Sequence, residues 1–137
     1  MKIVLDANCF LVSIPKKSQY RLIFESLLHK KFTLLISNEI LTEYEEIISQ
    51  KSNEIVAKNV VEMLLTLANV QKKEVYYKWN LISVDEDDNK YVDCAIVGNA
   101  DFLVTNDKHF KSLNKISFPK VNVIGIDTFI KMLEEFT

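Results

Sequence analysis

The chain has 137 residues, of which 48% are hydrophobic and 26% charged, as expected for one globular domain and not for a disordered chain. A formal net charge of −2 and a pI of about 5.7 argue against a protein that coats DNA, because such proteins usually present a basic face. No apolar run reaches the roughly 18 residues of a membrane span, and Asp6 interrupts the first apolar stretch. We therefore expect a cytoplasmic protein, with Cys9 and Cys94 as reduced thiols in or near its core.

Short apolar runs of the strand type alternate with longer stripes at helical spacing. In chain order the pattern predicts a strand at 2–5, a helix at 20–28, a strand at 32–36, a helix beginning at 37–38 and a helix at 56–68. After the less regular stretch 72–80 it predicts a strand at 81–84, a helix at 89–99, strands at 102–105 and 121–124, and a final helix capped by Asp127 and ending near residue 136. This alternation predicts a single domain over 1–137, with a three-layer α/β/α fold around a central, mostly parallel sheet.

Four acidic residues belong to segments that leave the same edge of this expected sheet. Asp6 directly follows the first strand, and Asp107 follows the strand that ends in FLVT. Glu43 and Asp93 lie early in the helices that follow the second and third strands. Because right-handed crossovers point the strands in one direction, their carboxyl ends share one edge, where open parallel sheets bind ligands. We therefore expect these four carboxylates to converge.

Converging carboxylates require a cation, because like charges repel and burial penalises the charged form. Oxygen ligands suit Mg²⁺ or Mn²⁺, which bind through a few carboxylates together with substrate phosphates. Two such ions can activate a water and stabilise the leaving oxygen of a phosphodiester. The sequence shows no Ser or Cys paired with a base that would indicate a covalent route. The pattern thus favours metal-dependent cleavage of a nucleic-acid backbone.

Each of these acids also has an ordinary structural explanation. Asp6 and Asp107 are placed to cap the helices that follow them, since Asp is a common N-cap. Asp93 is placed to interact with a helix dipole, and Glu43 to face solvent. Asp88 is interpreted as the N-cap of the helix that begins after it. Both the structural and the functional explanations remain open at this point.

Other side chains that could take part in catalysis or binding are interpreted as lying outside the acidic site. His109 is close to the last acid but is not needed for the expected chemistry. Tyr76, Tyr77 and Trp79 are interpreted as core or interface aromatics in preference to a platform for nucleic-acid bases. The lysines at 108–115 are placed to rim the pocket, where they would guide a nucleic-acid strand.

Four stretches carry a family resemblance: IVLDANCFLVS, ISNEILTEYEEI, DDNKYVDCAIVGNADFLVTNDKHF and VIGIDTFIKML. Over nearly its whole length the chain resembles PIN-domain proteins, and more narrowly the bacterial toxin subgroup in which a DDNK-type stretch precedes the third acid. The resemblance implies that the same four acids serve catalysis and metal binding: Asp6, Glu43, Asp93 and Asp107. Asp88 is the alternative to Asp93 as the third ligand.

The resemblance also implies a function. It implies an Mg²⁺- or Mn²⁺-dependent endoribonuclease that hydrolyses single-stranded or structured RNA, acting as the toxin of a toxin–antitoxin system. An antitoxin partner and a homodimeric state are expected on the same ground. Asn8 and Thr105 occupy positions that help to orient the pocket in the family. The alternative is a non-enzymatic PIN-like module that binds RNA or a protein.

Overall fold

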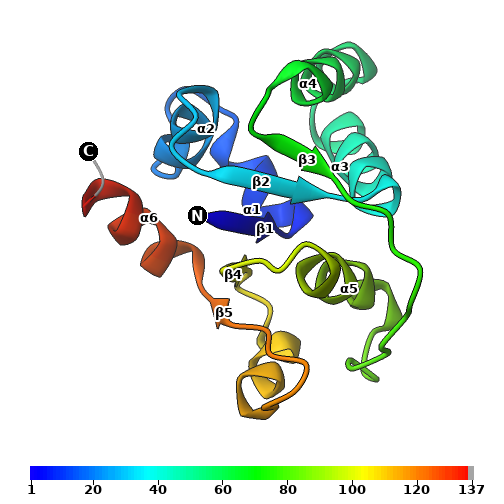
Figure 1. Cartoon of the computed structure of the whole chain (residues 1–137). Helices are drawn as coiled ribbons and strands as arrows, with labels where there is room; N and C mark the ends of the chain where they lie inside the picture. The colour runs from blue at the N-terminus through cyan, green and yellow to red at the C-terminus, as the bar shows by residue number, and fades with distance from the viewer. Residues whose placement is uncertain (136–137) are drawn as a thin grey trace.

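The computed structural model describes residues 1–135 and has the α/β architecture shown in Figure 1. Its strands are β1 (Lys2–Leu5), β2 (Thr33–Ile36), β3 (Val70–Lys72), β4 (Phe102–Val104) and β5 (Val123–Ile124). Its α-helices are α1 (Ala7–Ser13), α2 (Arg21–Leu28), α3 (Asn38–Lys51), α4 (Glu54–Thr66), α5 (Asn89–Val97) and α6 (Ile126–Glu135). Two 3₁₀ helices complete the fold: η1 (Glu86–Asp88) and η2 (Lys108–Lys115). Within residues 1–135, no helix has the length and apolar character needed to cross a membrane.

The strands form one sheet in the order β3-β2-β1-β4-β5, and every neighbouring pair is parallel. From β1 the chain steps outward to β2 and β3, and then returns past β1 to β4 and β5. Right-handed crossovers in these two directions place helices on opposite faces, and Figure 1 shows helices on both sides of the sheet. The expected α/β/α fold around a parallel sheet is therefore confirmed.

The middle of the core is built by β1 and β2. Their sequences, KIVL and TLLI, are rich in aliphatic side chains, which suits strands covered on both faces, and all but the first residue of each is buried. The next helices begin where a side chain satisfies a free backbone amide. Ser37 Oγ accepts from the Ile40 N–H at 3.3 Å at the start of α3, and Asn53 Oδ1 accepts from the Val56 N–H at 2.9 Å at the start of α4.

The strand expected at 81–84 is absent, and that prediction was wrong. The third strand is β3, whose short and partly polar sequence VQK hides the strand pattern. At 81–84 one side chain holds the backbone of Ile82: its N–H donates to Asn89 Oδ1 at 2.9 Å, and its carbonyl accepts from Asn89 Nδ2 at 2.8 Å. These bonds take the place of a sheet ladder, so the segment that leads into α5 lies outside the sheet.

The last helix also begins differently from the expectation. α6 starts at Ile126, so Asp127 lies inside its first turn and is not its cap. The Ile126 N–H donates to Asn106 Oδ1 at 3.0 Å. This bond ties the loop after β4 to the start of α6. The expected end of this helix, near residue 136, lies outside the described residues.

Tyr44 fixes α3 against the carboxyl end of β1. Its side chain is fully buried, its ring stacks on Phe10 with centroids 4.5 Å apart, and its hydroxyl donates to the Leu5 carbonyl at 2.6 Å. Tyr44→Phe keeps the ring and removes this bond, so we expect the free energy of unfolding to fall by about 0.5–1.5 kcal/mol in urea denaturation. Tyr76→Phe is the control, because Tyr76 is 88% exposed and its hydroxyl faces solvent. Equal stability of the two variants would show that the buried bond adds nothing.

Candidate functional site

The candidate site lies where the strand order reverses. β1 and β4 are neighbours, with Leu5 opposite Val104, but the chain leaves β1 toward β2 and leaves β4 toward β5. Such a switch point opens a crevice at the carboxyl edge of a parallel sheet. A cavity of about 580 Å³ lies here, and its lining includes five carboxylate side chains: Asp6, Glu43, Asp85, Asp88 and Asp107.

Asp6 combines a cap with a place in the cavity. Its backbone N–H donates to the Val104 carbonyl at 3.1 Å, which holds it beside β4. Its Oδ1 caps α1 by accepting from the Cys9 N–H at 2.8 Å, and its Oδ2 accepts from the Thr105 hydroxyl. Burial raises the pKa of Asp6, the bonds from Thr105 and Cys9 oppose this rise, and the charge of Asp107 adds to it. Asp6 thus both caps α1, as its structural explanation predicted, and lines the cavity, as its functional explanation predicted.

Asp107 reaches the cavity from the neighbouring strand. Its backbone N–H donates to Thr105 Oγ1 at 3.0 Å, so a single hydroxyl contacts both Asp6 and Asp107. Its Oδ1 accepts from the His109 N–H at 2.9 Å and thereby caps η2. Thr105 therefore links the two acids that follow β1 and β4.

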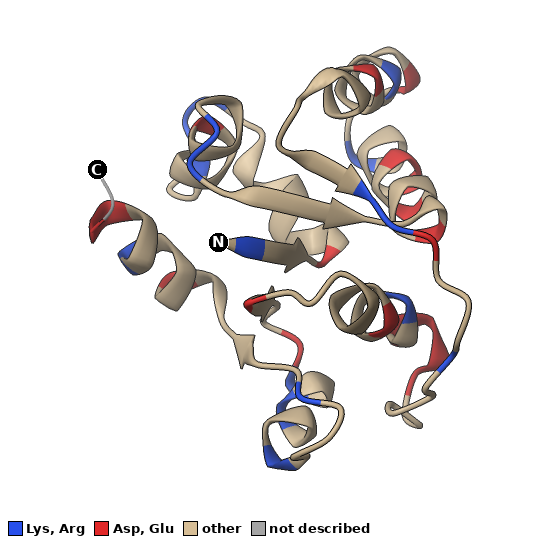
Figure 2. Cartoon of the chain, in the orientation of Figure 1, with Lys and Arg blue, Asp and Glu red and all other residues tan. Residues whose placement is uncertain are grey.

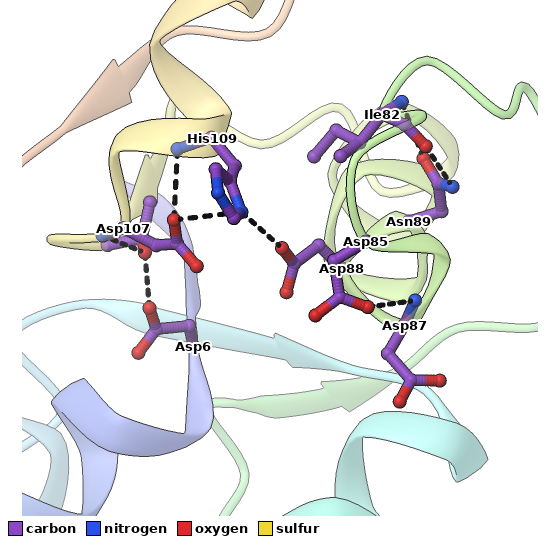
Figure 3. Close-up of polar contacts among 9 residues, drawn as sticks. Asp6, Ile82, Asp85, Asp87, Asp88, Asn89, Asp107 and His109 are labelled. Carbon is purple, nitrogen blue, oxygen red and sulfur yellow. Dashed lines mark hydrogen bonds and ion pairs between the residues drawn. The ribbon is translucent and has the colours of Figure 1, made fainter.

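Asp88 enters the cavity from the segment that precedes α5. It occupies the N-cap position without making a side-chain cap bond, and its buried Oδ2 has no hydrogen-bond partner among residues 1–135. Nδ1 of His109 lies 3.8 Å from Asp88 Oδ2 and 3.4 Å from Asp107 Oδ1, and Figure 3 shows the imidazole between the two carboxylates. Ligand atoms of these three residues lie within 4.8 Å of one another. That spacing suits a divalent cation.

The surroundings of Asp88 disfavour its charge when no cation is bound. Burial is the main cause, and the charges of Asp107 and Asp85 add to it, so the pKa of Asp88 rises from 3.8 to about 6 while His109 opposes the rise. A bound cation would favour the carboxylate form again. Perturbation of this kind in a cavity is typical of functional sites.

The metal-free protein should lose stability as the pH rises from about 4 to about 7, and Asp88 should account for part of this loss. Between its ordinary pKa of 3.8 and its folded pKa of about 6, the folded state binds more protons than the unfolded state. The resulting stabilisation is complete below the lower pKa and disappears as the pH rises through the upper one. Asp88→Asn lacks this pH-dependent contribution, so in chelator the variant should gain stability relative to wild type as the pH rises over this range, by about 1 kcal/mol once screening by solvent at this partly exposed carboxyl is allowed for. If urea denaturation gave a difference in free energy of unfolding between the two proteins that did not change with pH, this account would be contradicted.

Glu43 also faces the cavity, but two residues of α5 hold its carboxylate. The Tyr91 hydroxyl donates to Glu43 Oε1 and accepts from the Ala7 N–H at 3.1 Å. Nζ of Lys90 lies 3.2 Å from Glu43 Oε2. Both carboxylate oxygens therefore have a partner, and Glu43 joins α3 to α5 across the cavity wall.

Asp93 does not line this cavity. It is buried in the second turn of α5, and its Oδ1 accepts from the Trp79 N–H at 3.1 Å. It lines a separate cavity of about 390 Å³ together with Lys78 and Glu39, which pair at 4.0 Å. Burial raises the pKa of Asp93, whereas the Trp79 amide and Lys78 lower it.

Three of the four expected acids therefore share the cavity: Asp6, Glu43 and Asp107. Asp88 and Asp85 line the cavity with them, and the acidic stretch before α5 was the signal that made Asp88 an alternative. His109 was left out at the sequence level because the expected chemistry needs no histidine, although it lies between two carboxylates in the structure. Tyr91 was not considered at all, since a tyrosine among apolar helix residues looks like an ordinary core residue.

A model of the PIN domain matches residues 2–109, which is most of the chain. The chain belongs to the PIN-domain family. The resemblance seen in the sequence is thereby confirmed. PIN domains are generally nucleases, and the matched range includes the five acids of the cavity together with His109. No curated protein is significantly similar to the chain in sequence.

This PIN domain is also similar to a chain in a crystal structure of VapBC2 from Rickettsia felis, which is bound to a DNA fragment from its promoter. The two chains have 20% sequence identity and a TM-score of 0.62. The match covers 91% of this PIN domain and 98% of the other chain. At this level of identity the similarity shows a common fold.

Proposed function

We propose that this PIN domain is a metal-dependent endoribonuclease that hydrolyses RNA phosphodiester bonds with Mg²⁺ or Mn²⁺. The observation that carries the proposal is the group at the switch point between β1 and β4, where Asp88, Asp107 and His109 offer ligand atoms within 4.8 Å of one another. Asp6 lines the same cavity. The donors are mainly carboxylate oxygens, which hard divalent cations prefer.

The residues fit a bound divalent cation. The Oδ2 atom of Asp88 is buried and lacks a hydrogen-bond partner among residues 1–135, and burial together with neighbouring acids raises the pKa of this carboxyl. A cation would satisfy this oxygen and offset the repulsion. When bound, it would supply Lewis-acid chemistry, which neutralises charge on a phosphodiester and makes a water a better nucleophile.

The carboxylates have separate proposed roles. Asp6, Asp88 and Asp107 hold the cation, with Asp88 in place of the expected Asp93. Glu43 orients a water at the cavity wall, because Tyr91 and Lys90 fix the direction of its carboxylate.

Asp93 serves the fold in this proposal. Its carboxylate accepts from the Trp79 amide and so holds the irregular segment before α5 against that helix.

A toxin role with an antitoxin partner is the cellular part of the proposal. The similar Rickettsia felis chain comes from a structure of VapBC2, which supports an antitoxin partner for this PIN domain. In this proposal the antitoxin covers the cavity. The proposed setting is the cytoplasm, where RNA substrates are present. A homodimer, which the family resemblance implies, belongs to the same proposal.

Purified protein should cleave single-stranded RNA in Mn²⁺ or Mg²⁺, lose this activity in EDTA, and regain it with excess Mn²⁺. The second measurement is the melting temperature, because a ligand at about 100 times its Kd stabilises the folded state by about 2.7 kcal/mol. Stabilisation by Mn²⁺ without cleavage of any RNA would favour the alternative, a non-enzymatic PIN-like binding module. Absence of both effects would overturn the metal site as well.

A further inference from the structure

Three aromatic side chains form a cluster outside the acidic cavity, and two of them are exposed while Trp79 between them is half-buried. The rings of Tyr77 and Trp79 meet edge to face with centroids 4.8 Å apart, and those of Trp79 and Phe118 meet edge to face at 6.2 Å. Tyr77 is 66% exposed and Phe118 is 81% exposed, and the adjoining Tyr76 is 88% exposed. We call Tyr77, Trp79 and Phe118 the aromatic cluster. The exposure of Tyr76 and Tyr77 excludes the core role that the sequence suggested for them.

The cluster is assembled by the fold and does not belong to one loop. Tyr77 and Trp79 come from the segment before α5, and Phe118 comes from the loop between η2 and β5. The Trp79 N–H is fixed by its bond to Asp93 of α5. Exposed aromatic rings that are held around a fixed, half-buried tryptophan are typical of a binding site.

The charges beside the cluster favour a polyanion as its partner. From Lys108 to Ile126 the chain contains no Asp or Glu. This segment carries four exposed lysines: Lys108, Lys111, Lys115 and Lys120. Figure 2 shows the same absence of acidic colour along η2 and the loop that follows it. On the other side of the cluster, Lys78 pairs with Glu39 at 4.0 Å and four acids follow at 85–88, so the basic side of the cluster is the η2 side.

The segment before α5 meets η2 and the loop after it at two places, the acidic cavity and the aromatic cluster. Asp88, before α5, approaches His109 of η2 to 3.8 Å at the cavity. Trp79, also before α5, contacts Phe118, which follows η2. The cavity and the cluster are thus built by the same two segments, and one of these segments carries the exposed lysines.

We propose that the aromatic cluster is a stacking platform for unpaired bases of a single-stranded RNA, next to the phosphate held at the acidic cavity. Every base has a flat face that stacks on an aromatic ring, and exposed lysines attract the backbone between bases. Paired bases already stack on one another and cannot use the platform. This inference rests on the proposed nuclease function and adds that the substrate must offer unpaired bases beside the cleavage site.

Trp79 supplies a direct probe of the platform because it is the only tryptophan of the chain. A short single-stranded oligouridine RNA, added in EDTA so that cleavage cannot occur, should quench its fluorescence. A duplex RNA of the same length should leave it unchanged. Phe118→Ala and Tyr77→Ala should each weaken single-strand binding by roughly 5- to 150-fold in fluorescence anisotropy. Phe118→Tyr should keep the affinity, since it keeps a flat ring.

Two controls distinguish an effect of base stacking from an effect of lost apolar surface and from an effect of electrostatic attraction. Ile55 on α4 is 73% exposed, so Ile55→Ala removes apolar surface elsewhere and should bind as wild type. The dependence of affinity on salt gives the second control. Phe118→Ala should keep the slope of log affinity against log salt, whereas Lys111→Ala should reduce it by about 0.7.

The outcomes distinguish this proposal from the nuclease proposal. Wild-type affinity in both Ala variants, or equal quenching by duplex and single strand, would overturn the platform and leave a protein as the partner that covers the cluster. Cleavage in Mn²⁺ without quenching in EDTA would also overturn it, while the nuclease function stands. Quenching in EDTA without cleavage in Mn²⁺ supports the platform and overturns the nuclease function.

Discussion

Asp107→Asn is expected to abolish Mn²⁺-dependent cleavage of single-stranded RNA in a protein that remains folded. The amide keeps an acceptor oxygen for the His109 N–H, so the cap of η2 persists. The substitution removes one negative charge from the group that places Asp88, Asp107 and His109 within 4.8 Å. Loss of a charged ligand should lower kcat/KM at least about a hundredfold in single-turnover cleavage assays. Mn²⁺ should also no longer raise the melting temperature of the variant.

Asp101→Asn makes the same substitution at the opposite end of β4 and serves as the matched control. Asp101 is exposed, and its Oδ2 accepts from the Lys2 N–H at 2.7 Å, a bond that the amide oxygen of Asn can also accept. The control should cleave as wild type. Full activity and full Mn²⁺ stabilisation in Asp107→Asn would remove Asp107 from the metal set. Equal losses in both variants would show that the effect comes from net charge and not from the cavity.

Asp88→Asn and Asp93→Asn are expected to differ by about two orders of magnitude in activity, although both acids lie near the start of α5. The buried Oδ2 of Asp88 meets the cavity without a hydrogen-bond partner among residues 1–135, whereas Oδ1 of Asp93 accepts from the Trp79 N–H. Asn at position 93 keeps an acceptor for that amide, so Asp93→Asn should remain folded and active. Asp88→Asn should lose both cleavage and Mn²⁺ stabilisation.

Each of the two variants is the other's control, because both replace a buried or half-buried Asp by Asn near the start of α5. Cleavage rates and Mn²⁺ titrations of melting temperature should be compared for both under the same conditions. Loss of activity in Asp93→Asn alone, with a normal melting temperature, would reverse the assignment. Asp93 would then be the third ligand, as the family resemblance first implied.

The positions of Asp6 and Asp107 could be predicted from the sequence because each closely follows a buried apolar strand. In a parallel sheet the end of the strand fixes the edge, however the helices pack. The runs KIVL and FLV are short and apolar, and the structure makes them the neighbouring strands β1 and β4. The meeting of these two acids therefore follows from strand direction and strand order.

The choice between Asp88 and Asp93 could not be made from the sequence. It depends on where α5 starts relative to the sheet edge, and the segment before α5 has no periodic apolar pattern. The Asn89 side chain binds the backbone of Ile82, and η1 comes between that segment and α5. Bonds of this kind leave no trace in hydropathy, so the sequence predicted a strand at 81–84 that is absent, although α5 begins at Asn89 as expected. The roles of His109 and Tyr91 depend on tertiary contacts in the same region and could not be predicted for the same reason.

The bond between Thr105 and Asp6 spans 99 positions of the chain, which has a consequence for biosynthesis. Chains emerge from the ribosome with the amino terminus first, and N-terminal parts fold before the rest is made. A nascent chain that ends before β4 contains Asp6 but lacks Thr105, Asp107 and the strand that flanks the crevice. Under the proposed function, stalled or truncated translation products therefore cannot cut the RNA around them. The proposed nuclease site can form only when synthesis of the chain is nearly finished.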